Sequence, residues 1–369
     1  MFTFYIGGAG EASNALTEYQ KISGGTLFGQ GIDIADENTL AIGYGTGLSS
    51  GVNVYINSGA IWTLEQSITG TANMGKGVAL PADGNTLAIL AAGRVLVYIR
   101  SGGSWLLEQD WAPLNTLTNN AVSLNSTNGN TLAYGIPLHS NQAGIVEIYV
   151  RSGGVWTQQA TIQSTGITNG DQFGTSVSLS SDGNTLAVGA QWAEGGEGFV
   201  YIFTRSGTTW TQQASFQAQL GGSPGEHFGI SVSLSSDGNT LAASAPSYST
   251  GIGRVVIFTR SGTIWTSQAT LSGSDSVAGD EFGSSVSINS TGTKILIGAR
   301  SDDFIPGDGQ GSMYIFTGSG ASWTQAQYKL IASDQTTSAN LGRVVALRAD
   351  GSVGVGSAPP ASKVYIYNT

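Results

Sequence analysis

Apolar residues in the sequence occur in short runs that alternate with Ser, Thr, Gly and Asn. Residues 176–180 read SVSLS, residues 185–190 read TLAVGA and residues 199–205 read FVYIFTR. None of these runs has the length or the period of an amphipathic helix. Asp182-Gly183 stands between the first two runs, and this dipeptide is the strongest short-range signal for a β-hairpin. The pattern predicts consecutive antiparallel strands joined by tight turns.

The same group of runs recurs along the whole chain, at a spacing of roughly 45 to 60 residues that is typical of a four-stranded propeller blade. Each unit opens on an apolar residue followed by Gly, and a Ser-Gly-x-x-Trp hairpin leads into its last strand. The openings are Phe28-Gly29, Met74-Gly75, Phe173-Gly174, Phe228-Gly229, Phe282-Gly283 and Leu341-Gly342, with Thr118-Asn119 as a degenerate third. The hairpins end at Trp62, Trp105, Trp156, Trp210, Trp265 and Trp323. Seven openings predict seven blades.

One outer strand is missing from this count, because the last unit ends after its third run at residues 363–369. Residues 15–22, ALTEYQKI, match the outer-strand pattern VWTQQATI of residues 155–162, with Leu16 at the Trp position. We therefore expect an all-β, seven-bladed β-propeller of four-stranded blades, formed by residues 1–369 as one domain. The N-terminal strand completes the last blade and leaves no open sheet edge at the join. The repeat gives residues 1–10 no role.

Composition supports strands and turns and excludes several classes of partner. Gly contributes 55 of 369 residues and charged residues only 10%, below the usual quarter. A formal charge of −10 disfavours nucleic acid and anionic membranes as partners. The absence of cysteine excludes disulfides and thiolate chemistry.

The location of the protein is expected to be extracellular or surface-exposed, because the chain is poor in Lys and rich in Gly, Ser, Thr and Asn. No apolar run approaches the roughly 18 residues of a membrane span, so membrane insertion is not expected. Residues 1–10 do not read as a signal peptide. Either a signal has been removed or the protein leaves the cell by another route, for example inside a virus particle.

The segments GDQFGTSVSLSSDGNTLAVGA (residues 170–190) and GEGFVYIFTRSGTTWTQQASF (residues 196–216) resemble the FG-GAP repeat of bacterial surface and secreted proteins, which is related to the integrin α-subunit propeller. The resemblance covers essentially the whole chain. It implies a propeller fold and a binding or adhesion role outside the cell. Some integrin-type blades carry a calcium loop of the form DxDxDG, whereas the corresponding turns here hold only Asp182 or Asp237. We do not transfer that calcium site.

The candidate ligand-binding residues lie on the links between strands two and three and between blades. These links vary in length and content from unit to unit, whereas the hairpins hardly vary. They are His139, Trp192, Glu194, Glu197, Tyr248, Asp302, Asp303, Phe304 and Asp308. A Trp or Tyr among small polar residues suits stacking on a sugar ring or anchoring of a protein. The alternative for Trp192 is that it folds back over its own loop. Asp302, Asp303 and Asp308 have calcium-binding chemistry, but their spacing matches no known loop, so a solvated acidic turn is favoured.

Other recurring positions have structural alternatives. The residue after each opening Gly is predicted to ring the channel mouth, either contacting a ligand or forming a polar, water-filled plug. These residues are Gln30, Lys76, Asn120, Thr175, Ile230, Ser284 and Arg343. Asp171, Glu226 and Asp280 are expected to brace turns between blades. The hairpin Trp residues are expected to pack between blades, and the Arg residues at the ends of the third strands to serve solubility.

Catalysis is not expected from the motifs. The two histidines, His139 and His227, lie in different units, and the chain has no nucleophile elbow and no phosphate-binding loop. The favoured hypothesis is a non-catalytic extracellular recognition or adhesion module that needs no cofactor and binds a cell-surface glycan or protein. The alternative is a structural subunit of a surface assembly, an appendage or a virion. A propeller glycosidase or lyase is less favoured, and its sign would be a pair of carboxylates at the channel mouth.

Overall fold

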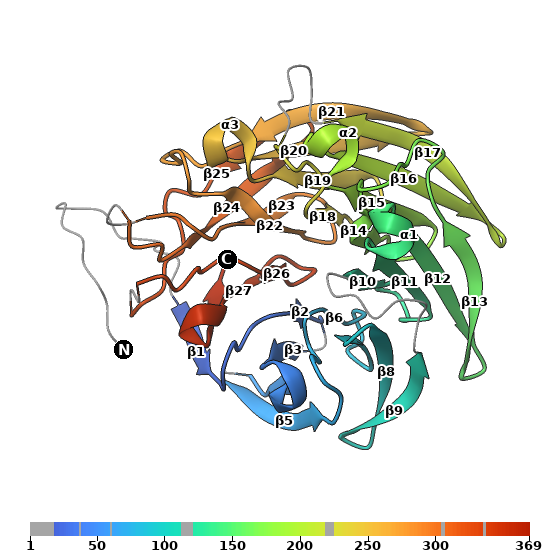
Figure 1. Ribbon diagram of the computed structural model, residues 1–369. Helices are drawn as coiled ribbons and strands as arrows, with labels where there is room; N and C mark the ends of the chain where they lie inside the picture. The colour runs from blue at the N-terminus through green and yellow to red at the C-terminus, as the bar shows by residue number, and fades with distance from the viewer. Residues whose placement is uncertain are drawn as a thin grey trace.

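Seven four-stranded antiparallel sheets stand around one axis in the computed structural model, as Figure 1 shows. The structure describes residues 18–36, 38–59, 61–111, 121–217, 225–303, 307–334 and 337–369. The innermost strands of neighbouring blades contact one another around the ring. The predicted all-β propeller and its number of blades are confirmed.

The blades follow the chain in order, each from its innermost to its outermost strand, except that the outermost strand of blade seven is the N-terminal β1. Blade one is β2 (Ile32–Ile34), β3 (Thr39–Tyr44), β4 (Gly51–Asn57) and β5 (Trp62–Thr69). Blade two is β6 (Val78–Ala79), β7 (Thr86–Ala91), β8 (Arg94–Ser101) and β9 (Ser104–Trp111). Blade three is β10 (Ala121–Leu124), β11 (Thr131–Ile136), β12 (Ile145–Ser152) and β13 (Val155–Ile162). Blade four is β14 (Phe173–Leu179), β15 (Thr185–Ala190), β16 (Phe199–Ser206) and β17 (Thr209–Gln217).

The remaining blades and the short helical turns complete the ring. Blade five is β18 (Val232–Leu234), β19 (Thr240–Ala245), β20 (Arg254–Ser261) and β21 (Ile264–Leu271). Blade six is β22 (Phe282–Ile288), β23 (Lys294–Ala299), β24 (Ser312–Ser319) and β25 (Ser322–Gln325). Blade seven is β26 (Val345–Leu347), β27 (Val353–Ala358), β28 (Lys363–Asn368) and β1 (Glu18–Ser23). The turns are η1 (Gly47–Ser49), α1 (His139–Gln142), α2 (Ala193–Gly196), α3 (Tyr248–Gly251) and η2 (Pro359–Ala361).

The ring is closed by the N-terminal strand, as predicted, although residues 15–17 of the predicted segment lie outside the described residues. β1 pairs antiparallel with β28, and Ile22 lies opposite Val364. Figure 1 shows β1 beside the C-terminal blade. Gln20 also reaches blade one, where its amide donates to Trp62 O at 3.1 Å and accepts from Trp62 N at 2.8 Å. Gln66 binds the backbone of Trp105 in the same way. β1 therefore completes one blade and joins it to the next.

The outer hairpins are joined from blade to blade by a repeated cluster of polar groups. In the first, Glu65 of blade one accepts hydrogen bonds from Trp105 Nε1 at 3.0 Å and from the Arg100 guanidinium of blade two. The same contacts recur at Glu108, Gln159 and Gln213, each bound by the Trp and Arg of the following blade. The expectation that the Trp residues pack between blades is confirmed. The expectation that the Arg residues serve solubility is wrong, because they are bound to the neighbouring blade.

Around the axis, side chains of one innermost strand accept backbone N–H groups of the next. Ser178 accepts from Leu234 N at 3.0 Å, and Ser287 accepts from Leu347 N at 3.0 Å. Blade one has Asp33 at this position, which accepts from Leu80 N at 2.8 Å. Although the side chain keeps some access to solvent, desolvation raises the pKa of Asp33 to about 7, against the lowering effect of its backbone hydrogen bonds. Asp33 is thus an ionisable group at a position that Ser occupies elsewhere.

Replacing Asp33 by Ser is expected to remove a pH dependence of stability. The pKa of Asp33 is raised in the folded state from 3.8 to about 7. Ionisation of Asp33 is less favourable in the folded state than in the unfolded state. The free energy of unfolding therefore falls as pH rises above about 4, and it stops falling above about pH 7. The full shift corresponds to about 4 kcal/mol between pH 4 and pH 8. Because the side chain keeps some access to solvent, we expect the stability of Asp33→Ser relative to the wild type to rise by about half of that, about 2 kcal/mol. Urea unfolding at pH 4, 6 and 8 measures it; a difference independent of pH would contradict the prediction.

Candidate functional site

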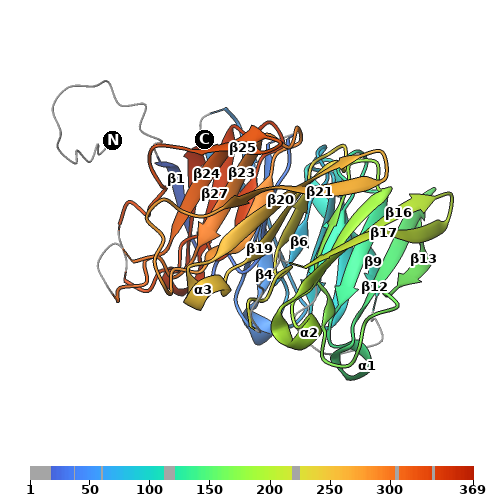
Figure 2. The ribbon, with the colours of Figure 1, turned by 90° about the horizontal axis from the view of Figure 1, so that it is seen from above.

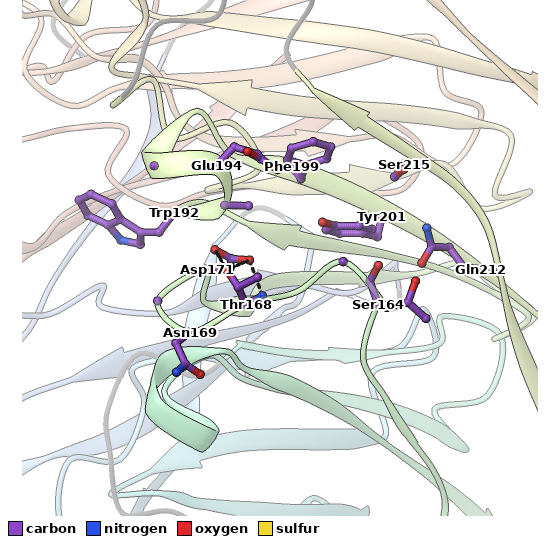
Figure 3. Close-up of a pocket in the computed structure, with 15 residues that line it drawn as sticks. Ser164, Thr168, Asn169, Asp171, Trp192, Glu194, Phe199, Tyr201, Gln212 and Ser215 are labelled. Atoms are coloured by element: carbon purple, nitrogen blue, oxygen red, sulfur yellow. Dashed lines mark hydrogen bonds between the residues drawn. The ribbon is translucent and has the colours of Figure 1, made fainter.

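A hollow of about 800 Å³ opens on blade four, beside the link that enters it from blade three. It lies among the links of the face that carries α1, α2 and α3, which stand along one side of the ring in Figure 2. Its walls come from the link between β13 and β14, the α2 turn, and side chains of β16 and β17. The larger and more polar lining residues are Ser164, Thr168, Asn169, Asp171, Trp192, Glu194, Phe199, Tyr201, Gln212 and Ser215 (Figure 3). A concave site with aromatic walls and a few polar groups is the usual form of a ligand pocket.

The link between β13 and β14 is held in shape by Asp171. Its carboxylate accepts a hydrogen bond from Thr168 N at 2.7 Å and another from the Thr168 hydroxyl at 3.1 Å. Asp280 accepts from Val277 N at 2.7 Å in the corresponding link of blade six. Both residues brace their turns as predicted. Glu226 differs, because it forms an ion pair with Arg254 at 2.9 Å.

The α2 turn positions Trp192 and Glu194 at the rim. Glu194 has a left-handed backbone conformation with φ of 51°. α1 and α3 form the same kind of turn in blades three and five, with Ser140 and Ser249 at positive φ. Three successive blades therefore present different side chains on one backbone shape, as a recognition surface on a rigid scaffold requires.

Aromatic rings form the opposite wall of the hollow, as Figure 3 shows. Phe199 and Tyr201 are stacked, with 5.7 Å between their ring centroids. Burial, and then the charges of Asp171 and Glu194, raise the pKa of Tyr201 to about 12, although a hydrogen bond with Ser164 lowers it. The Tyr201 hydroxyl therefore stays protonated at neutral pH and can donate a hydrogen bond to a ligand.

Trp192 lies at one end of the hollow with 44% of its surface exposed. Its ring packs edge to face on His227 of the next blade, at 4.3 Å between centroids. Burial lowers the pKa of His227, so this imidazole is neutral at pH 7. Trp192 is thus held by the neighbouring blade, and 44% of its surface remains exposed.

The other predicted link residues are spread over blades three to six. Glu197 accepts from Gln217 Nε2 at 3.3 Å, and His139 Nδ1 lies 2.8 Å from Ser140 Oγ. The Tyr248 ring lies under the Arg254 guanidinium at 3.9 Å. Of the predicted set, only Trp192 and Glu194 line the hollow. Phe304 lies outside the described residues.

The acidic link of blade six is used for its own structure. Asp302 is buried and accepts hydrogen bonds from Lys329 Nζ at 2.8 Å and from the Tyr314 hydroxyl at 3.1 Å. Asp303 accepts from the backbone of Gly307 at 2.6 Å, and Asp308 accepts from a neighbouring Gln side chain. No group of three His, Cys, Asp or Glu side chains that could hold a metal ion occurs in the part of the chain that the structure describes. The solvated acidic turn favoured from the sequence does not describe Asp302, which is buried in an ion pair.

The predicted channel-mouth residues fall into two groups. Gln30 Nε2 donates to Gly45 O at 2.5 Å, Thr175 donates to Gln172 O at 2.7 Å and Ser284 donates to Gly342 O at 3.1 Å. Lys76 and Arg343 are exposed, Ile230 is partly exposed, and Asn120 lies outside the described residues. Gln30 and Thr175 bind within their own blades, whereas Ser284 binds the next blade. In the second group, Lys76 and Arg343 leave cationic side chains open to solvent.

Several residues of the hollow were not singled out from the sequence. Phe199 and Tyr201 belong to a strand that reads as core, and Asn169 and Gln212 occur in segments that repeat elsewhere as ordinary links and outer strands. The available signal was a Tyr at the third position of the third strand in only some blades. A search for long, apolar helices able to cross a membrane finds none among the described residues.

Comparisons with known proteins agree on the fold. The FG-GAP repeat family model matches residues 156–203 and 265–316. The β-propeller domain of Cps50 (Swd1) from Myceliophteria thermophila superposes with a TM-score of 0.67 at 12% identity, over 96% of this chain and 99% of that domain. A chain of the mitotic checkpoint complex gives a TM-score of 0.67 at 15% identity, over 100% and 98% of the two chains. No curated protein matches the sequence.

Proposed function

We propose that this seven-bladed β-propeller, two segments of which match the FG-GAP repeat, is a non-catalytic extracellular recognition module that binds a cell-surface glycan through the hollow of blade four. Propellers serve in general as recognition and interaction modules, and FG-GAP repeats are typical of extracellular or surface proteins. The observation that carries the proposal is the hollow, where exposed Trp192 and the rings of Phe199 and Tyr201 face a polar loop.

The chemistry of the hollow suits a sugar better than an apolar ligand. A sugar has apolar C–H faces that stack on aromatic rings, and hydroxyl groups that both donate and accept hydrogen bonds. Trp192 supplies an aromatic surface at one end, while the amides of Asn169 and Gln212 and the carboxylates of Asp171 and Glu194 supply polar partners. The formal charge of −10 agrees with a ligand that is not itself strongly acidic.

A binding role is favoured over glycoside hydrolysis by the surroundings of Asp171 and Glu194. Hydrolysis requires one carboxyl group that is held protonated as a general acid beside a second carboxylate. Asp171 already accepts the N–H and hydroxyl of Thr168, so its carboxylate is engaged in shaping the loop. Glu194 stands exposed to solvent on the α2 turn. We therefore propose that the glycan is bound and not cleaved.

A structural role in a larger assembly is the second candidate, and the outer edge of blades one and two favours it. Leu64 on β5 and Leu106 and Leu107 on β9 are each more than half exposed. Blades three to five have Thr, Gln or Ser at the corresponding positions after the hairpin Trp. Exposed apolar side chains on neighbouring outer strands suit contact with another subunit.

Replacing Trp192 by Ala is expected to weaken glycan binding by about thirtyfold, which corresponds to about 2 kcal/mol for a central aromatic contact. The wild type is screened on a glycan array, and the best ligand is then titrated by calorimetry against both proteins. Tyr328→Ala is the matched control, because Tyr328 is also half exposed but does not line the hollow. It should bind as the wild type does.

Two outcomes would contradict the glycan proposal. Equal binding by Trp192→Ala and wild type would exclude the hollow, and release of reducing sugar would show that the protein is an enzyme. Absence of any glycan binding, together with reversible self-association in sedimentation, would favour the assembly role instead.

A further inference from the structure

Three blades have a Tyr at the third position of their third strand: Tyr201 in blade four, Tyr314 in blade six and Tyr365 in blade seven. In blades six and seven this Tyr is covered by an ion pair from the same chain. The Tyr314 hydroxyl donates to Asp275 at 2.7 Å, and Lys329 Nζ lies 2.8 Å from Asp275. The Tyr365 hydroxyl donates to Asp334 at 2.6 Å, and Lys21 Nζ lies 3.3 Å from Asp334.

The Asp and the Lys occupy equivalent positions in these two blades. Asp275 and Asp334 each stand seven residues before the opening residue of their blade, Phe282 or Leu341. Lys21 pairs with Tyr365 in the ladder of β1 and β28. Lys329 holds the same place opposite Tyr314, because its neighbour Leu330 bridges to Met313. Each blade therefore has a Tyr–Asp–Lys cluster at one site.

Blade four has the Tyr but neither of its partners. Gly166 stands seven residues before Phe173, at the Asp position, and Ser215 pairs with Tyr201 in the strand ladder, at the Lys position. Both small residues line the hollow. A Cβ built on Gly166 would meet no atom within 4 Å. Tyr201 lines the hollow and is 6% exposed, whereas Tyr314 and Tyr365 have no exposed surface. The hollow therefore lies where blades six and seven have the Asp and Lys of their Tyr–Asp–Lys clusters.

We propose that one uncharged sugar residue of the bound glycan occupies this space in place of the missing Asp and Lys. A sugar hydroxyl accepts from the Tyr201 hydroxyl as Asp275 does in blade six, and a neighbouring hydroxyl donates to Asp171 or Glu194. This inference rests on the proposed function and adds the class of sugar and its position.

The charge of the lining determines that class. Asp171 and Glu194 line the hollow, and no Lys or Arg occurs among its lining residues that the structure describes. A sialic acid, uronic acid or sulfated sugar would bring a negative charge beside two carboxylates with no cation to offset it. A lysine of a protein partner would meet the same carboxylates, but it would leave Gln212 and the rings of Phe199 and Trp192 without the contacts that a sugar makes.

The test restores the ion pair in blade four with the double variant Gly166→Asp/Ser215→Lys. The two added charges cancel, and blades six and seven show that this fold accommodates them. The wild type and the variant are applied to an array of neutral, amino, sialylated and sulfated oligosaccharides. We expect the wild type to bind neutral glycans, and the double variant to lose at least tenfold in affinity with an unchanged unfolding temperature.

Single variants keep the test informative if the double variant folds poorly. Tyr201→Phe removes one hydroxyl and should weaken binding severalfold, whereas the matched change Tyr314→Phe, in the covered blade, should leave binding unchanged.

The outcomes separate this inference from the proposed function. Neutral-glycan binding that persists in the double variant would place the sugar elsewhere and overturn the inference while the recognition function stands. Preferential binding of acidic glycans would overturn the sugar class. Binding of a lysine-rich peptide but of no glycan, lost in the double variant, would replace both with a protein partner. A wild type that binds no probe would overturn both.

Discussion

A chain that begins at residue 24 is expected to lose at least about 5 kcal/mol of unfolding free energy and to associate through its open edge. The deletion removes the whole of β1, whose strand ladder covers the outer edge of β28. It also removes the buried side chain of Ile22 and the two hydrogen bonds between Gln20 and Trp62. Burial of one large aliphatic side chain contributes about 1.5–3 kcal/mol, and each of several lost hydrogen bonds about 1 kcal/mol. Urea unfolding and sedimentation measure both effects.

A peptide added in trans distinguishes loss of the strand from a general failure to fold. A synthetic peptide of residues 14–25 should pair with β28, raise the unfolding midpoint and restore the monomer. The same peptide with Gln20→Ala and Ile22→Asp should not, because it lacks both the contact with blade one and the buried side chain. A truncated chain that stays monomeric with an unchanged midpoint would show that β1 does not close the ring.

Closure could be predicted because it depends on a local pattern. Residues 15–22 repeat the outer-strand sequence, and the last unit lacks such a strand, so counting strands was enough to pair the two ends of the chain. The observed register agrees with this, since Gln20 binds Trp62 as Gln66 binds Trp105. Strand periodicity and turn residues are short-range signals, and a repeat presents them several times in one sequence.

Contacts between blades could not be predicted from the sequence in this way. Glu65 belongs to one repeat, whereas Arg100 and Trp105 belong to the next, and within a single repeat each reads as an exposed polar or aromatic position. Blades three and four have Gln159 and Gln213 where blades one and two have Glu65 and Glu108, so the repeat does not show a constant acidic partner for the Arg residues. The Arg residues were assigned to solubility for this reason.

The candidate site was predicted only at its rim. Trp192 and Glu194 were found because they stand in a variable link, whereas Tyr201 reads as a core residue of a strand. Asp302 was taken as part of a solvated turn because its partner, Lys329, comes from a different strand connection. Gly166 and Ser215 carry no chemical signal of their own. Their significance comes from the charged residues at the same positions in blades six and seven.

The second large effect concerns the spacing between blades. We expect Gly298→Ala, on β23, to lower the free energy of unfolding by about 3 kcal/mol, as overpacking against a rigid neighbour does. A Cβ built on Gly298 would lie 1.8 Å from Gly342 O, a backbone atom of the next blade. Because no flexible side chain can move aside there, blades six and seven would have to separate. Urea unfolding followed by Trp fluorescence measures the loss.

Blade five provides the matched control, because Ser244 stands where the other blade has Gly298. Ser244 already has a Cβ, and its hydroxyl donates to Ser231 O at 3.3 Å. Ser244→Ala should therefore cost less than about 1 kcal/mol, the value of one modest hydrogen bond. Equal losses in both variants would mean that the blades adjust freely to an added methyl group. A large loss at Gly298 alone would mean that the close backbone approach sets the distance between blades six and seven, and that a side chain is tolerated only where the neighbouring blade is already spaced for it.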